Sequence, residues 1–225
     1  MDAQSRPDGV APAPATARGA RTRQALIRAA REVFERDGYI DARIIDITAE
    51  AGVATGTFYT HFTGKDRAFA AVIAELQDEL FDVGATGSGD RDVRRGIEEA
   101  NRAFLSAYRR NARLMAVLEQ AATVDDAIRR LRRARSQTFI DRNAAAIVRL
   151  QAAGLADREL DALFAARALN AMVSRMAYVA FVLGEPMPFD QLVTSVTRLW
   201  SNALRLPSTA VHLHGPAPVR ASGTS

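Results

Sequence analysis

Cysteine is absent from this sequence of 225 residues. Without it the chain can form no disulfide, no thiolate metal site and no cysteine nucleophile. Long apolar runs are also missing. No segment reaches the roughly eighteen uninterrupted apolar residues of a membrane-spanning helix, and the N-terminus has no apolar signal core. These absences favour a soluble cytoplasmic protein that does not contact a membrane.

Lysine occurs once, as Lys65, although lysine and arginine together number 30. The net charge of +4 is modest for this length, so any attraction for DNA must come from the local placement of charges. Hydrophobic residues make up 48% of the chain, enough for a sizeable core. Residues 1–17 are rich in Ala, Pro and Asp, and residues 207–225 contain Pro, Gly and Ser. We interpret both segments as disordered tails.

Between the tails, apolar residues recur at helical spacing, and no convincing strand or repeat appears. This pattern predicts an all-α protein. Gly38 is expected to end the first helix, Asp157 to cap a later one, and the Gly-rich segment 84–89 to form a loop. Helices are expected at about 22–37, 65–83, 91–110, 112–122, 125–153, 157–184 and 189–206, with two shorter helices between residues 43 and 65.

The segment 43–65 has the spacing of two short helices joined by a tight turn. Ile44, Ile47 and Ala51 share one face of the first helix, and Gly52 supplies the turn. Thr55 is a suitable N-cap for the second helix, whose Phe58 and Phe62 face inward and leave Thr57, Tyr59, Thr60 and His61 pointing away. This is the helix-turn-helix pattern, in which the second helix enters a DNA major groove. An ordinary helical hairpin with a polar outer face is the alternative.

The same segment resembles the TetR family of one-component transcriptional repressors, over residues 21–69. The matched positions are Asp46-Ile47-Thr48, Ala51-Gly52-Val53-Ala54, Gly56-Thr57-Phe58-Tyr59, His61-Phe62 and Lys65. Thr48 departs from the usual alanine. Arg43 departs from the usual capping Ser or Thr, a role that Asp41 can take instead.

The resemblance implies a three-helix helix-turn-helix domain at residues 18–65 and a larger helical domain at 66–206 that binds ligand and dimerises. It also implies a homodimer on a double-stranded, palindromic DNA operator, with Lys65 on a phosphate. Tyr59 is the expected second phosphate contact, Thr55 and Thr57 the base readers, and Gly56 the point of close backbone approach. The full predicted DNA-binding set is Arg21, Arg43, Thr48, Thr55, Gly56, Thr57, Tyr59, His61 and Lys65.

Two clusters of arginines are ambiguous. Arg18, Arg21 and Arg23 belong to a basic arm that either lies along DNA phosphates or is solvated helix surface. Five arginines between Arg129 and Arg135 spread around most of a helix, with Leu131 and Ala134 inward. We interpret this second cluster as a solvated face, and a second nucleic-acid surface is its alternative.

Catalysis is not expected. The chain has no phosphate-binding glycine loop and no carboxylate pair with a plausible cleft, and His212 and His214 in the tail make a poor metal site. We therefore expect no enzyme, no metal and no cofactor. The rival to a DNA-binding regulator is a helical small-molecule-binding or scaffold protein whose DNA-binding half is vestigial.

The larger helical domain is expected to bind a small apolar molecule or a lipophilic acid. Asn170, Ser174 and Tyr178 form a polar stripe whose partners are a ligand, a facing subunit or the backbone, and Arg175 beside it can pair with a carboxylate. The predicted ligand-binding set is Phe104, Tyr108, Met115, Leu118, Phe139, Asn170, Ser174, Arg175 and Tyr178.

The last two helices have faces suited to a dimer. The second half of the helix at 157–184 is apolar on nearly every side, which predicts burial against both its own core and a partner subunit. The final helix has an apolar stripe that includes Leu199 and Trp200. Trp200 suits either an interface anchor or the core.

Overall fold

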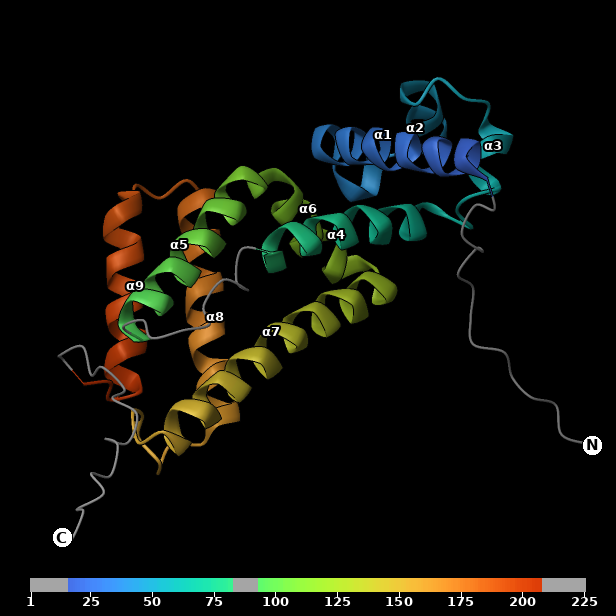
Figure 1. The fold of residues 1–225 in the computed structure, drawn as a ribbon. Coiled ribbons are helices and arrows are strands. Elements are labelled where there is room, and N and C mark those ends of the chain that lie inside the picture. Colours follow the sequence, from blue (N-terminus) through green and yellow to red (C-terminus); the bar gives the residue numbers. More distant parts are fainter. Residues whose placement is uncertain (1–15, 83–92, 208–225) are drawn as a thin grey trace, which may run out of the picture.

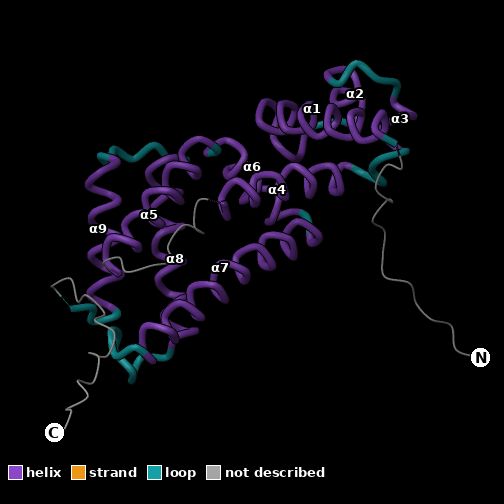
Figure 2. The backbone as a smooth tube through the Cα atoms, in the orientation of Figure 1, coloured by secondary structure: helices purple, strands orange, loops and turns teal. Residues whose placement is uncertain are grey.

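A computed structural model of the protein describes residues 16–82 and 93–207. Every regular element in these two ranges is a helix, as predicted (Figures 1 and 2). Both predicted tails, apart from residues 16, 17 and 207, and the predicted loop at 84–89 lie outside the described residues. The helices are α1 (Ala17–Asp41), α2 (Ile44–Glu50), α3 (Thr55–Tyr59), α4 (Lys65–Asp82), α5 (Val93–Arg110), α6 (Ala112–Val124), α7 (Asp126–Ala152), α8 (Ala162–Phe181) and α9 (Phe189–Ala203).

Helix α1 begins at Ala17, earlier than the sequence predicted, because Thr16 accepts a hydrogen bond from the Gly19 N–H at 3.2 Å and caps it. The arginines at 18, 21 and 23 therefore lie on a helix and not on a flexible arm. The inward side of α1 is the predicted apolar stripe, and these residues are fully buried: Leu26, Ala30, Val33 and Phe34.

Gly38 breaks the long helical run of α1, as predicted, although α1 as a whole extends beyond it. Its φ of 77° is in the left-handed region that favours glycine, and the chain continues helically to Asp41. The kink returns the Tyr39 ring to the core, where it packs on Phe69 at 5.2 Å. A Cβ on Gly38 would stand 3.3 Å from the Gln120 Oε1 of α6, so the kink is held close against the neighbouring helix.

The group α1–α3 forms one end of the molecule, and α4 runs from it into the remaining helices (Figure 1). Helix α6 packs against both α1 and α7, α7 packs along α8, and α5 packs along α9. Asp125 caps α7, accepting hydrogen bonds from the backbone N–H groups of Ala127 and Ile128. Among the described helices, none has the length and apolar character needed to cross a membrane.

Helix α8 begins at Ala162, so the predicted start at Asp157 is wrong. Asp161 is the N-cap and accepts from the Phe164 N–H at 2.7 Å. Asp157 lies in the preceding turn, where its side chain accepts from the Glu159 N–H and its own N–H donates to the Leu204 carbonyl. Because that long-range bond ties Asp157 to the end of α9, the local cap signal at this residue is overridden.

The outer faces of α8 and α9 carry exposed apolar side chains. Phe164 is 74% exposed and Leu199 is 51% exposed, and Leu163 and Leu183 are also open. Leu163 and Phe164 lie in the first turn of α8 and Leu183 follows its last residue, so the exposed apolar side chains of this helix lie at its two ends. Trp200 is 8% exposed and packs inside, which places it in the core and removes it as an interface anchor.

Candidate nucleic-acid interface and ligand cavity

The helix-turn-helix is formed by α2, a turn at Gly52 and α3. Gly52 has a φ of 65°, and the Val53 N–H reaches back to the Thr48 carbonyl at 3.0 Å, which closes the turn. Ile47, Phe58 and Phe62 are buried as predicted. Because the apolar side of α3 is committed to the core, its other side is presented outward.

The outward side of α3 carries most of the predicted DNA-binding set. Thr55, Gly56 and Tyr59 are exposed, Tyr59 by 57%, whereas Thr57 and His61 are half-buried. No atom lies within 4 Å of the position of a Cβ on Gly56, so the backbone there is open to close approach. The predicted cap is wrong: Thr55 is the first residue of α3, Ala54 occupies the N-cap position, and no side chain caps the helix.

Thr48 does not reach this surface. Its side chain is 2% exposed, and its hydroxyl donates to the Ile45 carbonyl at 3.0 Å and lies 3.4 Å from the Thr55 hydroxyl. Thr48 therefore supports the motif from inside, and a direct contact between Thr48 and DNA has no geometric basis here.

The two predicted arginines lie at the edge of the motif. Arg21 is exposed on α1. Arg43 is the N-cap residue of α2 and forms a forked ion pair with Asp46, at 2.8 and 3.0 Å. Asp41 is the last residue of α1 and does not cap α2, contrary to the alternative considered from the sequence.

Lys65 opens α4 and reaches back to the kinked end of α1. Its ammonium donates to the carbonyls of Tyr39 and Ile40 at 2.7 and 3.0 Å and lies 4.9 Å from the centre of the Tyr39 ring. The lysine thus ties the start of α4 to the last carbonyls of α1, a role that the sequence did not predict. An ammonium has three donors, so two bonds leave one available for a phosphate.

A cavity of about 670 Å³ lies between α5, α6, α7 and α8. Every residue of the predicted ligand-binding set lines it. Those nine residues are Phe104, Tyr108, Met115, Leu118, Phe139, Asn170, Ser174, Arg175 and Tyr178. A volume of this size is typical of sites that enclose a small organic molecule.

Arg135 is the residue of this cavity that sequence reasoning missed. It is 7% exposed, whereas Ala134, predicted to face inward, is exposed, so the predicted register of the arginine cluster is wrong. A signal existed, because Arg135 follows Leu131 by four residues and precedes Phe139 by four and so continues an apolar stripe.

The guanidinium of Arg135 is poorly satisfied. Its Nη1 donates to the Met115 sulfur at 3.5 Å, its Nε has no hydrogen-bond partner, and no described carboxylate forms an ion pair with it. Burial lowers the pKa of Arg135 to about 10, so the group is still charged at neutral pH. Nearby, Glu119 is paired with Arg132 at 2.7 Å.

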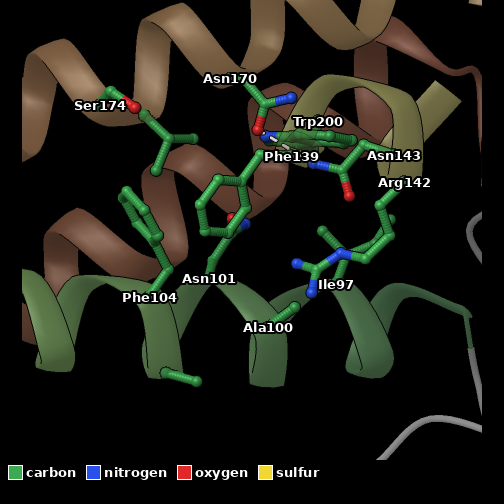
Figure 3. A pocket seen from close by; sticks show the side chains of 12 residues that line it. Ile97, Ala100, Asn101, Phe104, Phe139, Arg142, Asn143, Asn170, Ser174 and Trp200 are labelled. Atoms are coloured by element: carbon green, nitrogen blue, oxygen red, sulfur yellow. Dashed lines mark hydrogen bonds between the residues drawn. The ribbon is translucent and has the colours of Figure 1, made fainter. Parts of the chain in front are cut away.

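A second, smaller cavity of about 90 Å³ adjoins the first. The two share Phe104, Phe139, Asn170 and Ser174. Figure 3 shows Asn143 of α7 facing Asn170 of α8 across this space, where the Asn143 amide donates to the Asn170 carbonyl at 2.9 Å. Asn170 also donates to the Ala166 backbone carbonyl, so both of its polar atoms already have partners within the chain. In the described residues, no group of acidic or histidine side chains is arranged to hold a metal ion.

Two family models match this sequence. The model described as "Bacterial regulatory proteins, tetR family" matches residues 26–72, and "Transcriptional regulator EthR, C-terminal domain" matches residues 97–204. The first range contains the helix-turn-helix and the second contains both cavities.

Individual relatives agree with this assignment. The HTH-type transcriptional regulator SrpR of Pseudomonas putida is 46% identical over 59 residues, which are 26% of this chain and 28% of SrpR, so less than a third of that relative is spanned. EthR of Mycolicibacterium smegmatis is 23% identical over 184 residues, covering 80% of this chain and 84% of EthR. A crystal structure of a transcriptional regulator from Rhodococcus sp. Rha1 has the same fold, with a TM-score of 0.68, 24% identity and coverage of 81% of this chain and 96% of that one.

Fold, motif and matches together define a helix-turn-helix DNA-binding transcriptional regulator. The chain belongs to the TetR family. Proteins of this family regulate transcription.

Proposed function

We propose that this protein is a homodimeric repressor that leaves a palindromic operator when a mainly apolar small molecule enters the 670 Å³ cavity. The observation that carries this proposal is the position of α6, which lines the cavity with Met115, Leu118 and Gln120 and also packs against α1 of the DNA-binding end. A ligand that moves α6 would therefore also move α1, which packs against the helix-turn-helix.

The proposed DNA surface is the outward side of α3 with the residues around it. Tyr59 and Lys65 contact phosphates, Thr55 and Thr57 read base edges, and Gly56 lets the protein backbone approach the DNA closely. Arg21, Arg43 and His61 complete this surface. Thr48 is retained only as an internal support.

The proposed dimer pairs α8 and α9 with their copies across a two-fold axis. This interface would bury apolar side chains that are exposed to water in a single chain, namely Leu163, Phe164, Leu183 and Leu199. Two motifs related in this way read half-sites whose centres lie about 34–36 Å apart, or a multiple of that.

Two connections support coupling between cavity and motif. Helix α4 leads from the Lys65 anchor into the body, and Arg31 of α1 donates to the Asn111 side chain at the start of α6 at 2.6 Å. A ligand shifts the balance only by its difference in affinity for the two states, and an ordinary coupling weakens DNA binding by roughly 5–150-fold.

The test measures DNA binding by fluorescence anisotropy. The DNA is taken from the regions upstream of the genes that neighbour the gene for this protein. The wild type should bind a palindromic segment, and Tyr59→Phe should bind it more weakly because one phosphate bond is lost. Tyr178→Phe is the matched control, since it removes a hydroxyl that lines the cavity, and should bind as the wild type does. A folded protein that binds a small molecule but no such DNA would support the rival, a ligand-binding protein with a vestigial motif.

A further inference from the structure

The large cavity contains a buried cation without a counter-ion. Arg135 projects from α7 into its wall, is nine-tenths buried, and has an unpartnered Nε. A buried charge is costly unless it is paired, so the ligand-free protein carries a cost that an anion in the cavity would relieve.

A second donor faces the same space. Tyr108 of α5 lines the cavity, is 2% exposed, and its hydroxyl forms no hydrogen bond with any residue the structure describes. Burial, followed by the negative charge of Glu119, raises the pKa of Tyr108, so the hydroxyl keeps its proton. Arg135 and Tyr108 line the same cavity, from α7 and α5 respectively.

The other arginines of the cavity wall are less suited to hold an anion. Arg132 is paired with Glu119, and Arg167 is exposed. Arg175, the sequence-based candidate, is also exposed, and its guanidinium lies 5.2 Å from the centre of the Tyr178 ring. Of these residues, Arg135 alone combines burial with an unpaired donor.

We infer that the ligand is an amphipathic carboxylic acid whose carboxylate binds between Arg135 and Tyr108. Its apolar body lies along Phe104, Phe139 and Ile140, which line the same cavity. The carboxylate takes charge-assisted hydrogen bonds from the Arg135 guanidinium, which lines the cavity, and from the Tyr108 hydroxyl. The regulatory role of this ligand rests on the proposed function, but binding of the acid to the protein can be measured without DNA.

The experiment is isothermal titration of the full-length protein with octanoate, decanoate, dodecanoate and phenylbutyrate, each compared with the alcohol of the same skeleton. At least one acid should bind about tenfold or more tightly than its alcohol, because the bond is to a charged group. In Arg135→Met this preference should disappear while the affinity for the alcohol stays the same. Arg135→Lys, which keeps the charge, should retain part of the preference.

Arg133→Met is the matched control, since it makes the same substitution at an exposed arginine of the same helix that does not line the cavity, and it should keep the preference for acids. Equal binding of acids and alcohols by the wild type would overturn the inference. So would a preference that survives in Arg135→Met, or no binding by any acid of the panel. None of these outcomes affects operator binding, so the proposed function can fail or stand separately.

Discussion

The Tyr39 hydroxyl donates a hydrogen bond to the Asp125 carboxylate at 2.5 Å, joining the end of α1 to the start of α7. The other oxygen of Asp125 accepts from the N–H groups of Ala127 and Ile128, so the same carboxylate caps α7. Helix α7 carries Arg135 and Phe139 in the cavity wall. One acidic residue therefore connects the DNA-binding end to a helix of the cavity.

Tyr39→Phe should destabilise the protein by about 1–3 kcal/mol, because it removes a hydrogen bond to a charged group without changing the packing of the ring. It should also reduce the effect of ligand on operator binding, since the direct bond between α1 and the cap of α7 is lost. Urea unfolding and anisotropy with and without ligand measure the two effects. Tyr59→Phe, at an exposed ring, should leave the unfolding free energy unchanged, and equal stability of Tyr39→Phe and wild type would contradict the role of this bond.

The hydrogen bond between Tyr39 and Asp125 also predicts that the free energy of unfolding depends on pH in the acid range. Burial acts to raise the pKa of Asp125, but the hydrogen bonds from Tyr39, Ile128 and Ala127 outweigh it, and the pKa falls below its usual value. The folded state therefore holds the carboxylate charged more firmly than the unfolded state does. The stability it contributes is present above about pH 4 and is lost as the pH falls through the folded pKa. Urea unfolding between neutral pH and pH 3 should show the gap between wild type and Tyr39→Phe narrowing below about pH 4; a constant gap would argue against this linkage.

Lys65→Met should weaken DNA binding for all sequences alike, since phosphates carry no sequence. The magnitude of the slope of log K against log salt concentration should fall by about 1 for each half-site. Stability should fall as well, because the carbonyls of Tyr39 and Ile40 lose their donor. Lys65→Arg, which keeps charge and donors, is the control. Lower stability with an unchanged salt slope would show that Lys65 only joins α4 to α1.

Leu199→Glu should convert the dimer into a folded monomer, because the side chain is 51% exposed in one chain and a charge there opposes burial in an interface. Sedimentation velocity gives the oligomeric state, and circular dichroism confirms that the helices remain. Val148→Glu, at a similarly exposed apolar residue of α7, should stay dimeric. A dimeric Leu199→Glu protein would place the interface elsewhere. Trp200 is unsuitable for this test since its replacement would disrupt the core.

Arg135→Met should stabilise the ligand-free protein by about 1–4 kcal/mol, since a buried unpaired charge is replaced by an apolar chain of similar length. Because the folded-state pKa of Arg135 is lowered to about 10, the folded protein loses this proton before the unfolded chain does, and wild-type stability rises as the pH passes through that value. The gap between the two proteins should therefore narrow above pH 10. Urea unfolding at pH 7 and at higher pH measures both effects, and a less stable Arg135→Met would mean that the guanidinium is satisfied after all.

The helix-turn-helix could be predicted from the sequence because its signals are local. Gly52 makes the turn, and the spacing of Phe58 and Phe62 defines the inner face without reference to the rest of the chain. The convergence of the predicted ligand-binding set on one cavity was also predictable, since large apolar residues on successive amphipathic helices point to one interior. Local cap signals were less reliable: Thr55 and Asp157 both have suitable side chains, yet neither caps its helix.

The remaining differences arise from contacts between distant segments. The spacing of Arg135 from Leu131 and Phe139 indicates that it faces inward, but that it lines a cavity depends on the positions of α5 and α6. The bonds from Lys65 to the end of α1 span 25 and 26 residues and depend on the kink at Gly38. Neither sequence spacing nor propensity contains that information.

The close approach of Gly38 to Gln120 bears on the ligand concentration at which the regulated genes would be switched on. Gln120 lines the cavity and also lies against the kink of α1. The same segment of α6 therefore contacts both the DNA-binding end and the cavity proposed for the ligand. For a repressor of the proposed kind, linkage is reciprocal, and operator-bound copies hold ligand most weakly. Unbound copies would fill first as the metabolite accumulates, and promoters would be cleared only afterwards. The abundance of the protein would then set the dose at which its genes switch on.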